Sequence, residues 1–346
     1  MVVPLYQKIS DDLKDEITSK KIAVGEKLPT EMELSDSYHV SRITAKRALN
    51  ELEQLGLVSR TRGKGSFVKD TTEENPLPLN KVILFILPFG DLSFGNFNQG
   101  LVPFCKEAGY TVFITHADYL NETDASVIQQ NFSGLIYYPM NTDEYLDKLC
   151  MLASLDFPIV VLDKKIHGLQ LPCVQSDNAM GGYLATHHLI ELGHQKIAFI
   201  TLDEVHHPHT VRNRYLGYIQ ALAEAHLPYH TSFTDHEATS KNILEFVKNN
   251  EITGLICEND LIAIQCMNAL QAANYIIPSD ISIVGFDNIQ ASQLSNPPLS
   301  TIEQNFTELG IEAGQSLVNW VEKGEIPSDS KVAVKFIERN TTKELS

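Results

Sequence analysis

The stretch "VSRITAKRALNELEQLGLVSRTRGKGSFV", Val40 to Val68, gathers positive charge in a chain that is otherwise acidic. Residues 41–69 hold seven basic side chains and two acidic ones, whereas the 346-residue chain has a formal net charge of −17. Such an acidic surface repels polyanions, so a local basic island is either a chance cluster or a docking face. The order of helices and strands around the island bears on this choice.

Apolar spacing predicts three helices before the end of this stretch. A four-residue repeat predicts a first amphipathic helix ending near Lys20, with inward positions Leu5, Ile9, Leu13 and Ile17. Thr30 and Glu33 form a capping-box pattern that starts a second short helix. Ser41 caps a third helix that Gly56 ends, and its buried stripe comprises Ala45, Ala48, Leu49, Leu52 and Leu55.

After Gly56 the apolar period becomes two, which predicts a hairpin around Gly63 and Gly65. The third helix presents polar residues away from its apolar stripe, as a recognition helix in a major groove does: Arg42, Thr44, Lys46 and Arg47. The hairpin adds residues suited to phosphates or a minor groove: Arg60, Arg62, Lys64 and Gly65. The alternative is that these are ordinary solvated faces of a small helical domain. The joint placement of helices, hairpin and charge favours double-stranded DNA as a partner.

The signatures "LP-x-E-x-EL", "VSR-x-T" and "G-x-G-x-FV" in this region resemble the winged helix-turn-helix of GntR-type bacterial transcription regulators, over about residues 4–69. The resemblance implies that Arg42, Thr44, Lys46 and Gly65 touch DNA. Met32 and Lys46 stand where many members carry arginine. Because arginine reads guanine in a bidentate way and lysine is a point charge, base preference does not carry over directly.

Length and charge divide the chain into domains. A chain of 346 residues exceeds what one core usually supports. Residues 1–70 hold 12 Lys/Arg and 11 Asp/Glu, which leaves 15 and 33 of the totals of 27 and 44 for residues 71–346. The proline-punctuated stretch "DTTEENPLPLNK" lies between these parts. We therefore expect a DNA-binding domain at 1–70, a linker at 71–80 and a larger domain at 81–346.

Other features limit location and chemistry. No basic and apolar leader and no apolar run of membrane-spanning length is present, so we expect a cytoplasmic protein with no membrane partner. The five cysteines form no C-x-x-C pair, which favours reduced thiols over a disulfide frame. The histidines of "HHPH", at 206, 207 and 209, lack helical i, i+4 spacing, so a loop near a ligand site is favoured over a metal site. We expect no cofactor.

The larger part predicts an α/β fold. Short runs such as "KVILFILP", "FPIVVLD" and "DISIVGFD" are continuously apolar and alternate with helical stretches, which is typical of parallel sheets covered on both faces. Polar residues follow several of these runs, at the edge where open α/β sheets bind ligands. The chain has no G-x-G-x-x-G after the first strand, no Walker A sequence and no G-x-S-x-G elbow, so an enzyme is not indicated.

The markers "HLIELGHQKIAFI", "RNRYLGY", "ISIVGFDN" and "PPLSTIEQ" resemble the effector domain of LacI/GalR-type repressors, across about residues 80–340. The resemblance implies two Rossmann-like, periplasmic-binding-protein-like lobes with parallel sheets and a small sugar between them. The positions that match effector contacts are Arg214, Asp287, Asn259, Gln304, Asp163 and Phe94. Three of them have structural alternatives: Asp287 as a turn cap, Asn259 as a helix cap and Phe94 as a core residue.

A GntR-type head on a LacI/GalR-type body resembles the arabinose repressors of Gram-positive bacteria. It implies a homodimer that represses sugar-utilisation genes and is released from its operator by a small sugar, with a pentose such as arabinose as the first candidate. Activation in place of repression stays open. So does an effector that is a phosphosugar, another small metabolite or a protein co-repressor, and so does a sugar-binding module without a regulatory role.

Overall fold

The structure, a computed structural model, describes residues 5–18, 21–23, 25–54, 57–61, 65–68, 81–88, 96–140, 144–166, 168–201, 207–231 and 242–345. The chain divides into two compact units, Met1–Pro76 and Leu77–Ser346, here called the head and the body. The predicted linker, residues 71–80, lies outside the described residues.

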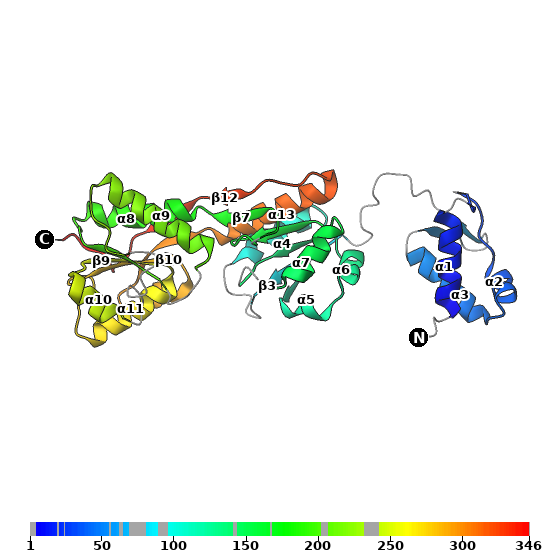
Figure 1. Cartoon of the computed structure of the whole chain (residues 1–346), viewed down its shortest axis with the longest axis horizontal. Helices are drawn as coiled ribbons and strands as arrows, with labels where there is room; N and C mark the ends of the chain where they lie inside the picture. Colours follow the sequence, from blue (N-terminus) through cyan, green and yellow to red (C-terminus); the bar gives the residue numbers. More distant parts are fainter. Residues whose placement is uncertain are drawn as a thin grey trace. The chain divides into compact units, whose positions relative to one another are not determined.

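The head contains the predicted helices and hairpin (Figure 1). Its elements are α1 (Leu5–Thr18), α2 (Glu31–Ser37), α3 (Arg42–Gln54), β1 (Val58–Thr61) and β2 (Gly65–Val68). The two strands pair antiparallel, with Val58 opposite Val68. One apolar core joins α1, α2 and α3 to both strands, and the apolar repeats in the sequence supply most of it: Ile9, Leu13, Leu34, Ala45, Ala48, Leu49, Leu52, Val58 and Val68. Leu5 was wrongly predicted to face inward: it is the first residue of α1 and is 58 % exposed.

Caps start the second and third helices where the sequence predicts them. The Thr30 hydroxyl accepts a hydrogen bond from the Glu33 backbone N–H at 3.3 Å, and the Glu33 carboxylate accepts one from the Thr30 N–H at 2.7 Å. The Ser41 hydroxyl accepts from the Thr44 N–H at 3.2 Å. These bonds satisfy N–H groups that a helix start leaves unpaired, so both predicted caps are confirmed.

The body has two lobes, here called the N-lobe and the C-lobe. The N-lobe is a three-layer unit. Among the described residues its sheet has the strand order β12-β7-β6-β5-β3-β4, all parallel. Alternate strand residues point to opposite faces, so α4 and α13 cover one face and α5, α6 and α7 the other (Figure 1). The bounds are β3 (Val82–Leu87), β4 (Thr111–His116), β5 (Gly134–Tyr137), β6 (Ile159–Leu162), β7 (Cys173–Ser176), β12 (Ser330–Val332), α4 (Phe97–Glu107), α5 (Asp118–Glu122), α6 (Ala125–Asn131), α7 (Leu146–Ser154) and α13 (Phe306–Lys323).

The C-lobe repeats this layering. Its described strands have the order β13-β11-β10-β9-β8, parallel except for β13, which runs antiparallel to β11. Helices α8 and α9 cover one face, and α10 and α11 cover the other. The bounds are β8 (Ile197–Ile200), β9 (Gly254–Cys257), β10 (Ser282–Asp287), β11 (Ser300–Gln304), β13 (Val334–Ile337), α8 (Asn178–Glu191), α9 (His209–Glu224), α10 (Ile243–Asn250), α11 (Asp260–Ala272) and α12 (Gln290–Leu294).

The chain passes between the lobes at three places within the body. It leaves the N-lobe after β7, returns after β11 into α13, and crosses again between β12 and β13. The Asp177 N–H donates to the Val332 carbonyl at 2.8 Å, and the Ser176 hydroxyl donates to the Gln304 side-chain carbonyl at 2.6 Å. The three crossing segments are therefore tied together, and residues at the ends of β7 and β11 lie at the lobe junction.

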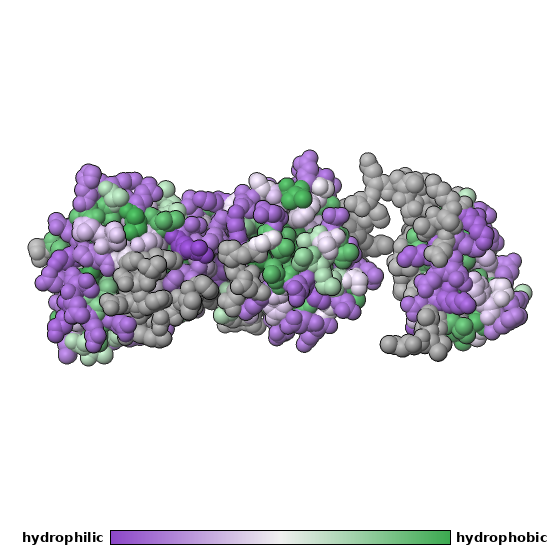
Figure 2. Space-filling view, in the orientation of Figure 1, coloured by the Kyte–Doolittle hydropathy of each residue, from purple (hydrophilic) through white to green (hydrophobic). Residues whose placement is uncertain are grey.

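Hydropathy on the surface of the body is uneven. Figure 2 shows apolar residues in the region of α7 on the face in view. Leu146 and Met151 of α7 are exposed, as is Leu155 directly after it. All five cysteines are free thiols, and Cys150 on α7 is exposed while the other four are buried. In the described part of the chain, no helix combines the length and apolarity needed to cross a membrane.

Candidate DNA-binding face and lobe-junction site

The first turns of α3 present a basic face. Arg42, Lys46 and Arg47 are exposed, and Thr44 is half-buried with its hydroxyl 2.8 Å from that of Ser41. Arg42 and Lys46 are four residues apart, so they lie on one side of the helix. The Arg47 guanidinium carbon lies 3.9 Å from the centre of the Tyr6 ring on α1, a cation–π contact that holds it against the first helix.

Sequence reasoning did not select Ile43, which is 81 % exposed at the start of α3. An apolar side chain exposed beside basic ones in this turn suits the methyl group of thymine in a major groove. Little in the sequence indicated this role, because a single isoleucine beside an apolar stripe is expected to be part of the core.

The hairpin is described only in part. Gly65 has φ +120°, and a Cβ there would lie 2.6 Å from Cε of Lys27, so glycine suits both the backbone and the contact. Arg62 and Lys64 lie outside the described residues, as does the side chain of Arg60.

Arg214 on α9 is held by several contacts at the lobe junction. It is 6 % exposed, and its Nε donates to Oδ1 of Asn178 at 2.7 Å. Its Nη1 donates to the Glu258 carbonyl, and its Cζ lies 3.6 Å from the centre of the Phe286 ring. A guanidinium carries five N–H donors, so these contacts fix its plane and leave further donors for a ligand.

Asp287 and Gln304 join Arg214 in one network. Asp287 ends β10 and lies 3.5 Å from Nη2 of Arg214, and Gln304 donates to the same carboxylate oxygen at 2.6 Å. Because Gln304 also accepts from Ser176, the network links both lobes. Burial raises the pKa of Asp287 to about 6, although Arg214 and the Gln304 hydrogen bond act in the opposite direction.

Asp163 adds a second carboxylate to this region. It follows β6, is 7 % exposed and has φ +65°. Its Oδ1 is buried without a hydrogen-bond partner among the described residues. Such an oxygen costs free energy unless a ligand or water satisfies it.

Tyr138 is a candidate site residue that was not predicted from the sequence. It follows β5, is 9 % exposed, and burial together with the nearby Asp163 raises the pKa of its hydroxyl. Its ring centre lies 5.2 Å from that of Phe97, which packs at 5.1 Å on Phe306. The signal available was its place directly after an apolar run. Phe94, the aromatic residue that the family resemblance predicted as an effector contact, lies outside the described residues.

Asn259 caps a helix, which is the structural alternative given for it above. Its Oδ1 accepts from the Ile262 N–H at 2.9 Å and so caps α11, and its Nδ2 donates to the Glu258 carboxylate at 3.3 Å. Its neighbour Asp260 is fully buried and accepts from the Thr301 hydroxyl and the Ile289 N–H. Burial and the nearby Asp287 raise the pKa of Asp260 to about 7.

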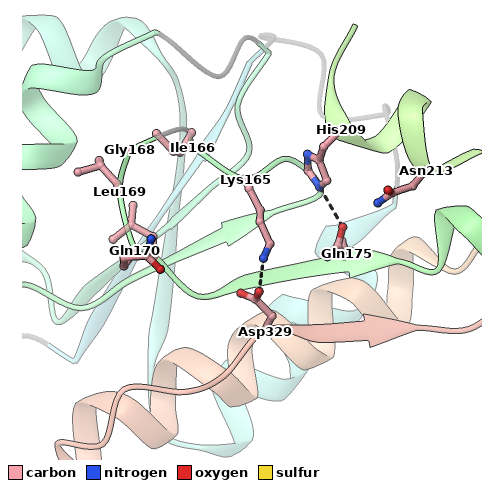
Figure 3. Close-up of a pocket in the computed structure, with 10 residues that line it drawn as sticks. Lys165, Ile166, Gly168, Leu169, Gln170, Gln175, His209, Asn213 and Asp329 are labelled. Atoms are coloured by element: carbon pink, nitrogen blue, oxygen red, sulfur yellow. Dashed lines mark hydrogen bonds and ion pairs between the residues drawn. The ribbon is translucent and has the colours of Figure 1, made fainter. Parts of the chain in front are cut away.

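A hollow of about 440 Å³, shown in Figure 3, is lined in part by Asn213 and Gln175, the residues next in sequence to Arg214 and Ser176. Its wall includes Gln175, the residue of β7 before Ser176, so the hollow is on the opposite side of that strand from the Ser176–Gln304 bond. His209 from the C-lobe lies 3.0 Å from the Gln175 side chain, and Lys165 pairs with Asp329. In the described part of the chain, no group of three His, Cys, Asp or Glu side chains is placed to hold a metal ion.

Two family models match separate parts of the chain. Residues 5–68 match the bacterial regulatory proteins of the gntR family, and residues 186–342 match a periplasmic binding protein-like domain. The first range covers the described elements of the head, and the second covers the C-lobe from the second half of α8 onward, together with α13 and β12 of the N-lobe.

Relatives extend the match to the whole chain. The arabinose metabolism transcriptional repressor of Geobacillus stearothermophilus is 28 % identical over 99 % of both chains. The transcriptional repressor PurR of Aliivibrio fischeri is 30 % identical over 65 % of this chain and 69 % of its own. A LacI family regulator from Enterococcus faecium, solved with bound ribose, aligns with a TM-score of 0.63 and 26 % identity, covering 77 % of this chain and all of that one.

A DNA-binding head joined to a two-lobed ligand-binding body defines the ligand-responsive transcription regulators. The chain belongs to this class as a GntR-type winged helix-turn-helix joined to a LacI/GalR-type effector domain. These relatives are named as transcriptional repressors.

Proposed function

We propose that the protein represses sugar-utilisation genes and is released from its operator by a small neutral sugar bound at the lobe junction. The observation that carries the proposal is the Arg214–Asp287–Gln304 network, in which a guanidinium from α9, a carboxylate at the end of β10 and an amide at the end of β11 are held together at the lobe junction. Groups of this kind each bind one or two hydroxyls in a defined plane, which suits a polyol.

The charges at the junction favour a neutral ligand over a phosphosugar. Three carboxyl groups gather here: Asp287 lies 3.5 Å from the Arg214 guanidinium, and Asp163 and the buried Asp260 lie near Asp287. The nearby ammonium of Lys164 donates to the Met140 carbonyl at 2.8 Å. A phosphate dianion placed here would be repelled by carboxylates in a region of low dielectric.

Within the sugars, we take a pentose as the first candidate. The proposal draws on two relatives: a repressor named for arabinose metabolism covers nearly the whole chain, and a regulator solved with ribose shares the body. Asp163, Tyr138 and Asn259 are further candidates for contact with the ring or its hydroxyls, as is Phe94.

The mechanism requires two lobe arrangements that the sugar binds unequally. Because Ser176 and Gln304 lie on crossing segments, a ligand that engages Gln304 and Asp287 alters contacts at the points where the lobes turn. We propose that a homodimer transmits this change to two heads on a palindromic operator. A coupling of about 1–3 kcal/mol changes operator affinity roughly 5- to 150-fold.

Fluorescence anisotropy on duplex DNA from upstream of the gene tests the proposal. The protein is bound at fixed moderate salt, and arabinose, xylose, ribose, galactose and glucose are added in turn. Tight binding that one pentose abolishes supports the proposal. Tight binding that no sugar changes refutes the sugar effector, and binding strengthened by a sugar refutes release from the operator.

A further inference from the structure

The two helices behind the lobe-junction network touch through their backbones. A Cβ on Gly182 of α8 would lie 1.9 Å from the carbonyl oxygen of Arg214 on α9. A Cβ on Gly217 of α9 would lie 2.0 Å from the carbonyl oxygen of Ala179 on α8. Both distances are far below the 3.0 Å that real Cβ atoms keep from their neighbours, so the contact requires glycine at both positions.

Glycine weakens a helix interior, so its presence there needs a reason. Gly182 lies in the second turn of α8 and Gly217 in the middle of α9. The carbonyl that meets Gly182 belongs to Arg214 itself. The close approach of the helices therefore sets the position of the Arg214 backbone relative to α8.

The start of α8 then holds the Arg214 side chain. Asn178 is 2 % exposed, and its Nδ2 donates to the Ser176 carbonyl at 3.0 Å. That bond turns Oδ1 of Asn178 toward Nε of Arg214, where it accepts at 2.7 Å. Since a hydrogen bond weakens steeply beyond about 3.2 Å, widening the gap between the helices by the width of a methyl group would break it.

A third glycine seats the ring beneath the guanidinium. A Cβ on Gly181 would lie 2.5 Å from Cε2 of Phe286. The ring of Phe286 in turn lies 3.6 Å from Cζ of Arg214. Successive residues of α8 thus make room for the Arg214 backbone and for the aromatic face under its side chain.

We propose that Gly181, Gly182 and Gly217 are positioning residues that hold the Arg214 guanidinium in place at the lobe junction. The proposal rests on the proposed function insofar as Arg214 binds the effector. A merely structural role, in which the glycines pack the C-lobe without acting on Arg214, gives different results in the two experiments below.

The first experiment observes Arg214 without a ligand. Full-length protein is labelled with ¹⁵N-arginine, and the Nε–Hε signal of Arg214 is assigned by its loss in Arg214→Lys. We expect exchange of this hydrogen with water to be about tenfold faster in Gly182→Ala and Gly217→Ala than in the wild type, as for the loss of roughly one hydrogen bond. Arg214 exchange at the wild-type rate in both variants overturns the proposal.

Two further variants make this result interpretable. Gly314→Ala in α13 is the control, because its Cβ would crowd Phe104 of α4 at 2.9 Å and not Arg214, so Arg214 exchange should stay at the wild-type rate. Gly181→Ala meets side-chain atoms of Phe286 and Ile302 in place of backbone, so it is the milder variant should Gly182→Ala fail to fold. A changed shift of the Arg214 signal in Gly181→Ala supports the proposal, and an unchanged one overturns the role of Gly181.

The second experiment measures sugar affinity by titration calorimetry with L-arabinose and D-ribose as probes. We expect Gly182→Ala to bind about tenfold more weakly, and the Arg214→Lys/Gly182→Ala double variant to bind no more weakly than Arg214→Lys alone, since the glycine acts through the arginine. Additive losses overturn the proposal. Wild-type affinity in Arg214→Lys refutes the effector role of Arg214, and the exchange experiment then decides the positioning role alone.

Discussion

Two arginines on the same helix, two residues apart, have opposite environments. Arg214 is buried in the junction network, whereas Arg212 is exposed and donates from Nε to the His207 carbonyl at 3.2 Å. Because Arg214 is buried and Arg212 is exposed, replacing Arg214 tests the lobe-junction site. Replacing Arg212 tests whether a substitution elsewhere on α9 has an effect of its own.

We expect Arg214→Ala to need about 100-fold more sugar to release operator DNA, because a charged hydrogen bond in a buried site contributes roughly 3 kcal/mol. Apo DNA affinity should stay at the wild-type value, since the head is untouched. Anisotropy titrations of operator DNA against sugar measure both quantities. Arg212→Ala is the control and should respond like the wild type; a normal response in Arg214→Ala would place the effector elsewhere.

Asp260 carries a stability prediction with a definite sign. Its folded pKa of about 7 exceeds its ordinary value of 3.8, so the folded state binds the proton more tightly than the unfolded state. Its contribution to stability is complete below pH 4 and is lost as pH rises to about 7, at up to about 1.4 kcal/mol per pH unit.

Asp260→Asn removes this titration and keeps an oxygen for the Ile289 N–H. From pH 5 to pH 8, we expect the melting temperature of the wild type to fall by about 5 °C more than that of the variant. This figure follows from about 2–4 °C per kcal/mol for a domain of this size. Calorimetric melting at both pH values gives the result. A difference that is the same at pH 5 and pH 8 would show that Asp260 is ionised throughout in the folded protein.

At the scale of elements, α3 is the helix that combines a fixed start with a free basic face. The cap at Ser41 sets where the helix begins, and the buried stripe sets which side faces inward. Arg42 and Lys46 are left on the outside as a consequence of helical period.

We expect Arg42→Ala and Lys46→Ala each to weaken operator binding by about tenfold or more, since interactions of this kind contribute roughly 1–3 kcal/mol. Because Lys46→Ala removes a cation that neutralises a phosphate, it should also lower the salt dependence of binding by about one ion. Lys8→Ala on α1, also exposed, is the control and should bind as the wild type does. Equal affinity for all three variants and the wild type would remove α3 from the DNA interface.

The crossing segments are the other elements that matter for function. Ser176 ends β7 and Gln304 ends β11, and their side chains meet at 2.6 Å. Strand β7 belongs to the N-lobe sheet and β11 to the C-lobe sheet, so this hydrogen bond connects the two lobes. These strand ends are where we propose that ligand contact and lobe movement involve the same residues.

For the whole molecule, charge and symmetry lead to one prediction. The acidic body repels DNA, and one head reads only a few base pairs, so tight binding needs two heads. We expect light scattering to give twice the chain mass of 38.6 kDa and a palindromic operator to bind at least about 100-fold more tightly than one half-site. A monomeric mass, or equal affinity for both DNAs, would contradict the homodimer.

The sequence by itself predicted most of the helices and strands and the separation of the chain into two parts with different roles. Helix caps, the glycine hairpin and the continuous apolar runs are local signals, so Thr30, Ser41 and strands such as β10 are where they were predicted. The resemblance to two families supplied the lobes and the candidate residues. Strands β7 and β11 were not predicted, because "CVQS" and "STIEQ" carry polar side chains that lie at the lobe junction.

Only the tertiary structure decided what those residues do. Asn178 anchors Arg214 and Tyr138 lies near Asp163, because packed helices and neighbouring strand ends bring together residues that are far apart in the chain. Packing within the C-lobe likewise buries Asp260 beside Asp287 and raises the pKa of Asp260. Local propensity acts over a few residues, whereas these contacts join positions far apart in the chain, so no local pattern records them.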